Sequence, residues 1–177
     1  MRDVLKFWFE ELEPSQWFTK DLALDQKIIE RFSVTHEAAS KGELFGWRDS
    51  AKGRLAEVIV LDQFSRNMYR DKPESFASDA LALVLAQEAI FVGADKALSP
   101  VERSFLYMPF MHSESQLIHE EAVKLYTDNG IESNLSFEMK HKVIIDRFGR
   151  YPHRNEILGR ESTKEEIAFL NEPNSSF

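Results

Sequence analysis

Apolar residues recur at intervals of three and four positions along almost the whole chain, and no run alternates strictly between apolar and polar residues. An interval near 3.6 residues is typical of an amphipathic helix, whereas strict alternation is typical of a half-buried strand. The pattern therefore predicts an all-α fold. Because Gly and Pro residues divide the chain into short periodic segments, we expect about eight or nine helices joined by short connections.

Local signals set the expected helix boundaries. Ser99-Pro100-Val101-Glu102 places Ser at the N-cap, Pro at the first helical position and Glu three residues after the cap, which is a capping box. Ser162 and Glu165 predict a second capping box. Pro109 lacks an N–H donor, so we expect a bend from Phe110 to Glu114. The expected helices cover roughly residues 4–8, 21–41, 50–66, 79–92, 99–109, 115–128, 135–148 and 163–170.

A polar signature, Asp-x-Phe-x-Arg, occurs twice, each time behind a pair of branched apolar residues, as Asp62–Arg66 and Asp146–Arg150. Asp and Arg are seldom fully buried unless they are paired. Each copy stands at the end of a strongly apolar helical segment, so the sequence predicts a polar group of residues inside the protein. The copies begin 84 positions apart, which fits two helical-repeat units of about 42 residues.

The composition limits the classes of partner. A chain of 177 residues fits one domain, and we expect a single all-helical domain over residues 1–177. The net charge of −8 opposes nucleic-acid binding, which depends on Lys and Arg displacing counterions. The chain has no cysteine, which fits a reducing compartment, and no apolar run of the length that a membrane helix needs. We therefore expect a cytoplasmic protein that binds neither nucleic acid nor membranes.

Three segments concentrate polar residues: Asp62–Asn67, Tyr107–Glu120 and His141–Asn155. The third carries three arginines in an acidic protein, and a guanidinium offers a planar, permanently charged fork for a carboxylate or phosphate. Gly149 and Pro152 indicate that this segment ends in a structured loop, where binding residues are often found. The candidate ligand-binding residues are Asp62, Arg66, Asn67, His112, Glu114, Asp146, Arg150, His153 and Arg154.

A purely structural interpretation of the doubled signature stays open. Asp62 with Arg66, and Asp146 with Arg150, have the i,i+4 spacing of an ordinary helix ion pair. Each pair could be only a staple between stacked helices. The functional interpretation gains support because both pairs fall in segments that also contain His and Asn residues.

A metal site is a further alternative in the middle segment. It would use His112, Glu114, His119 and Glu120, since imidazole and carboxylate groups suit zinc or iron. Their spacing differs from the His-Glu-x-x-His arrangement, which places two imidazoles one helical turn apart. We therefore expect these groups to cap a kink and to pair with arginines, and we assign neither a metal ion nor another cofactor.

Longer blocks of the sequence extend this pattern. They are Asp62–Asn67, Phe105–Glu114 and Phe148–Asn155, with Val4–Phe9 at the start and Ser175–Phe177 at the end. Together they resemble the signature blocks of a bacterial uncharacterised family, domain of unknown function 924, over essentially the whole chain. The resemblance implies a tetratricopeptide-like, right-handed helical superhelix and no established activity. Asn174 stands where that family more often has Gly.

We expect the helices to form a polar pocket that binds a small anionic molecule or a peptide carboxylate, with arginines holding the anion and Asp62 and Glu114 orienting them. One alternative is an enzyme, a metal-independent hydrolase or transferase, with His112 or His153 as general base beside Glu114. Another is a protein-interaction scaffold with a concave helical surface. Because the second copy of the signature leads into the loop Pro152–Asn155, we expect that copy to meet the ligand and the first to be a structural brace.

Overall fold

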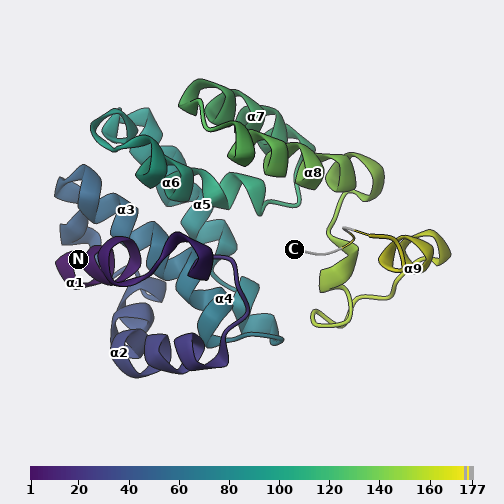
Figure 1. Cartoon of the computed structure of the whole chain (residues 1–177), viewed down its shortest axis with the longest axis horizontal. Helices are drawn as coiled ribbons and strands as arrows, with labels where there is room; N and C mark the ends of the chain where they lie inside the picture. The colour runs from purple at the N-terminus through teal and green to yellow at the C-terminus, as the bar shows by residue number, and fades with distance from the viewer. Residues whose placement is uncertain (174, 176–177) are drawn as a thin grey trace.

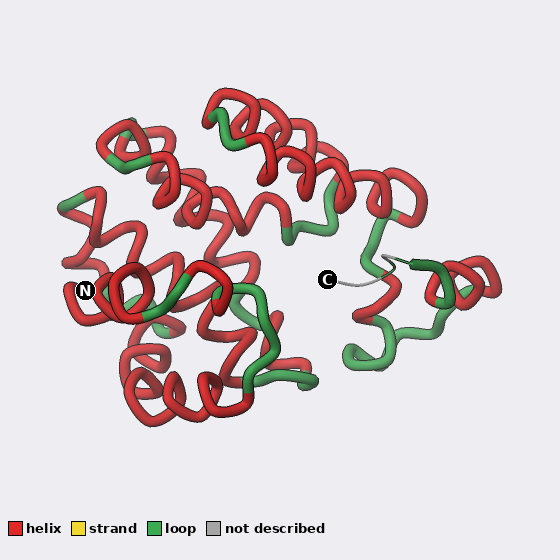
Figure 2. Tube along the Cα trace, in the orientation of Figure 1, coloured by secondary structure: helices red, strands yellow, loops and turns green. Residues whose placement is uncertain are grey.

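The chain folds into helices joined by short loops, and the computed structural model describes residues 1–173 and Ser175. No β-strand occurs within these described residues, which Figure 2 draws as helix and loop. The expected all-α fold is therefore confirmed. The part of the family resemblance that rests on Asn174, Ser176 and Phe177 lies outside the described residues.

The observed helices follow the local start signals. Asp21 caps the second helix by accepting hydrogen bonds from the backbone N–H groups of Ala23 (2.8 Å) and Leu24 (3.3 Å). Both bonds of the expected capping box between Ser99 and Glu102 are present. The α-helices are α1 (Arg2–Lys6), α2 (Leu22–Ser40), α3 (Ala51–Ile59), α4 (Ser65–Met68), α5 (Asp79–Phe91), α6 (Pro100–Met111), α7 (Gln116–Asn129), α8 (Glu132–Phe148) and α9 (Lys164–Leu170).

Other helical geometries connect these elements. The π-helices are Phe7–Glu11 and Val60–Phe64. The 3-10 helices are Pro14–Gln16, Phe45–Asp49, Pro73–Phe76, Ala94–Ala97 and Pro152–Arg154. As a result, α3, the second π-helix and α4 form one unbroken helical segment over residues 51–68, close to the single helix expected there.

The bend expected directly after Pro109 is displaced towards the C-terminus. Helix α6 continues through Pro109 to Met111, and the chain changes direction only at residues 112–115. All the side chains from Ser104 to Met111 are buried. Their packing holds the last turn in place although Pro109 cannot donate a helical hydrogen bond.

The second capping box is also shifted by one residue from the expected Ser162 and Glu165. Thr163 is the N-cap of α9, and its side chain and that of Glu166 exchange hydrogen bonds with each other's backbone N–H groups. Arg150 donates two hydrogen bonds to the carboxylate of Glu166. This distant contact favours Glu166 over Glu165 in the capping position.

An aromatic group forms the centre of the larger hydrophobic core. The rings of Phe7, Phe32 and Phe64 contact one another, with centroid distances of 4.8 Å to 6.1 Å. Trp8 adds contacts to Phe64 and Phe105 at 5.7 Å each. Because these rings come from α2, α6 and both π-helices, they fix the N-terminal helices around α6.

The helices from α5 to α8 pack in sequence order. Figure 1 shows α7 and α8 beside each other, and α7 also packs against α6, which contacts α5 and α3. The end of α8 and the chain that follows it form a smaller core from Ile144, Ile145, Tyr151 and Phe169. Within residues 1–173 and Ser175, no helix combines the length and the apolar character needed to cross a bilayer.

Gly53 allows the start of α3 to pack closely against the preceding 3-10 helix. Its backbone N–H donates to the side chain of Ser50, the N-cap of α3. A methyl group added at Gly53 would overlap the backbone carbonyl of Trp47. Gly46 lies in the same region, but a methyl group there would meet no atom within 4 Å.

We predict that Gly53→Ala destabilises the fold by about 1–3 kcal/mol, because overpacking outweighs the better helix propensity of Ala. Gly46→Ala is the matched control and should leave the free energy of unfolding within about 0.5 kcal/mol of the wild type. Urea denaturation measures both. Equal stabilities of the two variants would contradict the close approach at Gly53.

Candidate functional site

A cavity of about 720 Å³ lies where distant segments of the chain meet. Its walls come from the loop before α2, the second π-helix, α4, α6, α8 and the segment after α8. The apolar lining includes Trp17, Phe18, Phe76, Met108, Met111 and Phe137. The polar lining includes Gln63, Arg66, Asn67, Arg70, His112, His141, His153 and Arg154.

Asp62 is a fully buried acid that contacts three residues of the cavity lining. It lies in the π-helix Val60–Phe64, a geometry that often occurs at functional positions because it displaces side chains from the regular helical register. Its carboxylate accepts hydrogen bonds from His112 Nδ1 (2.8 Å) and Gln63 Nε2 (2.5 Å), and it forms an ion pair with Arg66 Nη1 (3.1 Å). The expected pair of Asp62 and Arg66 is therefore formed.

The charge states of Asp62 and His112 follow from this arrangement. Burial alone would raise the pKa of Asp62, but the charge of Arg66 and the hydrogen bond from His112 hold that pKa well below its usual value. Burial and the charge of Arg66 lower the pKa of His112, although the carboxylate opposes this shift. Asp62 is consequently ionised and His112 neutral at pH 7.

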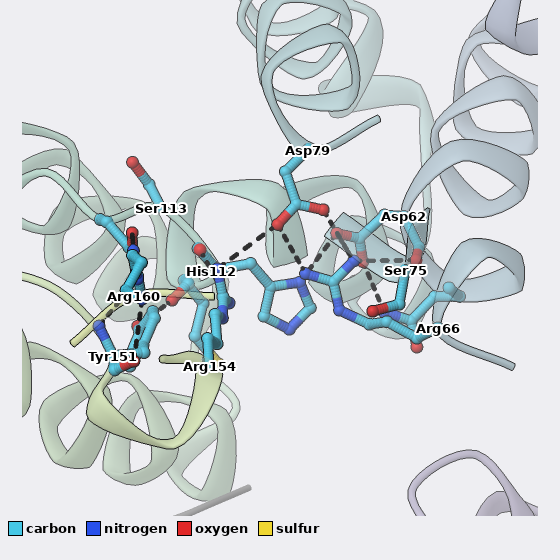
Figure 3. Close-up of polar contacts among 12 residues, drawn as sticks. Asp62, Arg66, Ser75, Asp79, His112, Ser113, Tyr151, Arg154 and Arg160 are labelled. Carbon is cyan, nitrogen blue, oxygen red and sulfur yellow. Dashed lines mark hydrogen bonds and ion pairs between the residues drawn. The ribbon is translucent and has the colours of Figure 1, made fainter. Parts of the chain in front are cut away.

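Asp79 connects Arg66 and Arg154, two of the three arginines that line the cavity. Its carboxylate receives two parallel hydrogen bonds from Arg66, both at 3.0 Å, and approaches Arg154 Nη1 at 3.5 Å. Figure 3 shows the imidazole of His112 between Arg66 and Arg154. The sequence indicated Asp79 only as a helix start, so its role as the shared acid of this network was missed.

Arg154 is the less completely neutralised of the two arginines. It is 6% exposed, its Nη2 donates to the backbone oxygen of His112 (3.1 Å), and its Nε is buried with no hydrogen-bond partner among the described residues. The guanidinium lies over the rings of Phe76 (4.6 Å) and Tyr151 (4.5 Å). Burial and the nearby charge of Arg66 lower the pKa of Arg154.

Glu114 supports the loop after α8 and is not a partner of His112. It accepts a hydrogen bond from the backbone N–H of Tyr151 (2.8 Å) and two from Arg160 (2.6 Å and 2.9 Å). Burial opposes ionisation of Glu114, but the hydrogen bonds from Arg160 and Tyr151 lower its pKa. The carboxylate that His112 contacts is that of Asp62, whereas the partners of Glu114 are Arg160 and the backbone of Tyr151.

The rings of three further histidines, His119, His141 and His153, lie near that of Tyr151. Its hydroxyl donates to the backbone oxygen of Met111 (2.5 Å) and lies 3.2 Å from His119 Nε2, while His119 Nδ1 lies 2.7 Å from Glu138. Within the described part of the chain, no group of three or more His, Asp or Glu side chains is placed to hold a metal ion. His112, Glu114 and His119 instead have separate partners.

The second copy of the signature does not form the expected pair. Asp146 binds Lys142 (2.7 Å), and Arg150 binds Glu166 (2.6 Å). Gly149 ends α8 with a left-handed backbone (φ 68°), so Arg150 leaves the helix and no longer lies over Asp146. Gln63 and Arg66 of the first copy line the cavity, whereas Arg150 of the second copy joins α9 and the loop that follows it brings His153 and Arg154 to the cavity.

Asn67 also lines the cavity, and its side chain is bound to a second ion-paired group. Its side chain donates to Asp25 (2.8 Å), which also receives two hydrogen bonds from Arg70 (2.6 Å and 2.7 Å). Neither Asp25 nor Arg70 was among the expected residues. The position of Arg70, four residues after Arg66 and just beyond the end of α4, was the available sequence signal.

The comparisons with known proteins agree with this architecture. The model of a family described as "Bacterial protein of unknown function (DUF924)" matches residues 4–174, so the chain belongs to that family. The solved structure of a protein of unknown function from Agrobacterium tumefaciens is similar, with 41% sequence identity, a TM-score of 0.92 and 96% of each chain covered. No curated protein matches the chain.

The neutral histidines couple the stability of the fold to pH. Burial, followed by the charge of Arg154, lowers the pKa of His153 to about 4, and burial lowers the pKa of His141 to about 3. In the unfolded chain the pKa of histidine is about 6.5. In the intervening pH range the unfolded state binds more protons, so the free energy of unfolding falls as the pH falls.

We predict that His153→Gln reduces this dependence. Between about pH 6 and pH 5, the slope of the unfolding free energy against pH should decrease by ~1 kcal/mol per pH unit, because one group that protonates only on unfolding is removed. Urea titrations at several pH values measure the slope. Asn171→Gln, an exposed change at the C-cap of α9, should retain the wild-type slope, and an unchanged slope in His153→Gln would refute the assignment.

Proposed function

We propose that the 720 Å³ cavity binds a small molecule that combines an apolar, aromatic part with a carboxylate or another anionic group. Ligand pockets commonly have volumes of about 300–1,000 Å³, a mainly apolar lining and a few polar groups that fix orientation. This cavity has the corresponding combination of aromatic and Met side chains with His112 and Arg154. Its size and lining support a small molecule over an extended peptide.

Arg154 carries the proposal, because its positive charge is incompletely compensated. Its acidic neighbour Asp79 is already bound by Arg66 through two hydrogen bonds of 3.0 Å, whereas the contact of Asp79 with Arg154 is 3.5 Å. Burial and the charge of Arg66 also lower the pKa of Arg154, so the nearby acids do not fully offset these two effects. An anionic group near Arg154 would supply the missing negative charge, and charge-assisted hydrogen bonds to a guanidinium are among the stronger polar contacts.

The apolar part of the ligand would lie against the opposite walls. Trp17 and Phe18 line the cavity from the loop before α2, and Phe137 lines it from α8. Aromatic side chains bury large areas and favour offset or edge-on contact with another ring. We therefore propose small aryl carboxylates, such as phenylacetate, as the ligand class.

Binding of phenylacetate should depend on Arg154. Isothermal titration calorimetry should show Arg154→Gln weakening the affinity by about 10–150-fold, the equivalent of about 1.5–3 kcal/mol for hydrogen bonds to a charged group. Arg154→Lys should give an intermediate loss, because it keeps the charge and loses the fork. Arg150→Gln, which changes a neighbouring arginine bound to Glu166 and absent from the cavity lining, should bind as the wild type does. Undiminished binding by Arg154→Gln would remove this site from consideration.

We also propose that the helices form a superhelix, that the chain is one domain and that the protein is cytoplasmic, as expected from the sequence. The succession of contacts from α5 to α8 supports a tetratricopeptide-like, right-handed superhelix. The cavity draws residues from Trp17 to Ile157, which supports one domain over the chain. The absence of cysteine supports a cytoplasmic location.

A further inference from the structure

We propose that Asp62 and His112 form a general-base pair that hydrolyses esters of small aryl carboxylic acids in the cavity. This inference rests on the proposed function, because the carboxylate that Arg154 would bind is the acid product of that reaction. It adds a chemical step, the reacting atom and the substrate class.

The hydrogen bond between the two residues determines which imidazole nitrogen can react. The carboxylate of Asp62 is fully buried and accepts three polar contacts, so His112 Nδ1 must carry the proton that points to it. In a neutral ring the other nitrogen, Nε2, then carries a lone pair. Nε2 has no hydrogen-bond partner among the described residues, and the ring of His112 lines the cavity. This nitrogen is therefore available to accept a proton from a bound molecule.

Water can reach His112 from a second cavity. A smaller cavity of about 390 Å³ adjoins the larger one, and Phe76, His112 and Arg154 line both cavities. An ester in the larger cavity and a water molecule at His112 can consequently occupy the site together.

The hydrolysis balances with water as the co-reactant. His112 Nε2 takes a proton from water as the water oxygen forms a bond to the ester carbonyl carbon, and the carbonyl electron pair moves to oxygen. Collapse of this tetrahedral intermediate breaks the bond to the alcohol oxygen, which takes the proton from the imidazolium. The intermediate is negatively charged, and Arg154, whose Nη2 lies 3.1 Å from the backbone oxygen of His112, is placed to stabilise it.

Asp62 is a positioning residue in this scheme. It fixes the tautomer of His112 and stabilises the imidazolium that forms. The charged and titratable groups around His112 are Asp62, Arg66, Asp79, His141, His153 and Arg154. Asp146 occupies the same place in the second signature, but it is exposed and binds Lys142. Asp146→Asn is therefore a matched control for Asp62→Asn.

The experiment follows the release of 4-nitrophenolate from 4-nitrophenyl phenylacetate by the full chain. We expect saturable turnover, a loss of about 100-fold or more in kcat for His112→Gln, the range typical of a lost general base, and a comparable loss in Asp62→Asn, where the amide reverses the tautomer. Asp146→Asn should match the wild type. Wild-type turnover no faster than buffer, or a folded His112→Gln variant with the full rate, would overturn the proposal.

Nitrogen-15 NMR of the wild-type imidazoles gives a test that does not depend on the folding of any variant. At neutral pH His112 should be protonated on Nδ1 and unprotonated on Nε2, and a protonated Nε2 would overturn the proposal. The outcome is separable from that of the binding experiment. If phenylacetate binds through Arg154 without ester turnover, the catalytic inference fails and the proposed binding function stands. If His112-dependent turnover occurs and phenylacetate does not bind, the proposed ligand class fails.

Discussion

The buried negative charge of Asp62 is the constraint on which the polar interior depends. An isolated carboxylate would be very costly to remove from water, so a folded chain must surround it with donors and a positive charge. Gln63, Arg66 and His112 meet this requirement. Since His112 comes from the end of α6, satisfying the charge also fixes the position of α6 relative to the π-helix.

The compensation extends from Asp62 as a sequence of alternating charges. Arg66 links Asp62 to Asp79 at the start of α5, and Asp79 approaches Arg154 after α8. The hydroxyl of Tyr151 adds a hydrogen bond to the end of α6. These contacts hold the segment after α8 against the earlier helices, and the cavity lies where those elements meet. The segments that carry the charged network therefore also form walls of the cavity.

Local sequence signals located the helices, although α6 runs past Pro109 and the cap of α9 is shifted by one residue, but they did not identify the partners of charged residues. The cap at Asp21 and the box at Ser99 depend on neighbouring atoms and could be recognised. The pairing of Glu114 with Arg160 joins residues 46 positions apart, and no spacing rule predicts it. The two signatures differ for a similar reason. The π-helix at Asp62 and the left-handed Gly149 give one motif two different geometries.

The distinction between a structural ion pair and a binding site lies in how completely each guanidinium is satisfied. Arg70 and Arg160 each donate several hydrogen bonds to carboxylates, and Arg66 is shared by two acids, as expected of groups that only stabilise the fold. Arg154 is more buried than any of these three arginines, yet its contact with an acid is the longest and its Nε has no described partner. A fold that used Arg154 only as a staple would gain by moving an acid closer. Its incomplete compensation beside a neutral imidazole, at a cavity wall, is what an anionic ligand or a developing negative charge would complete.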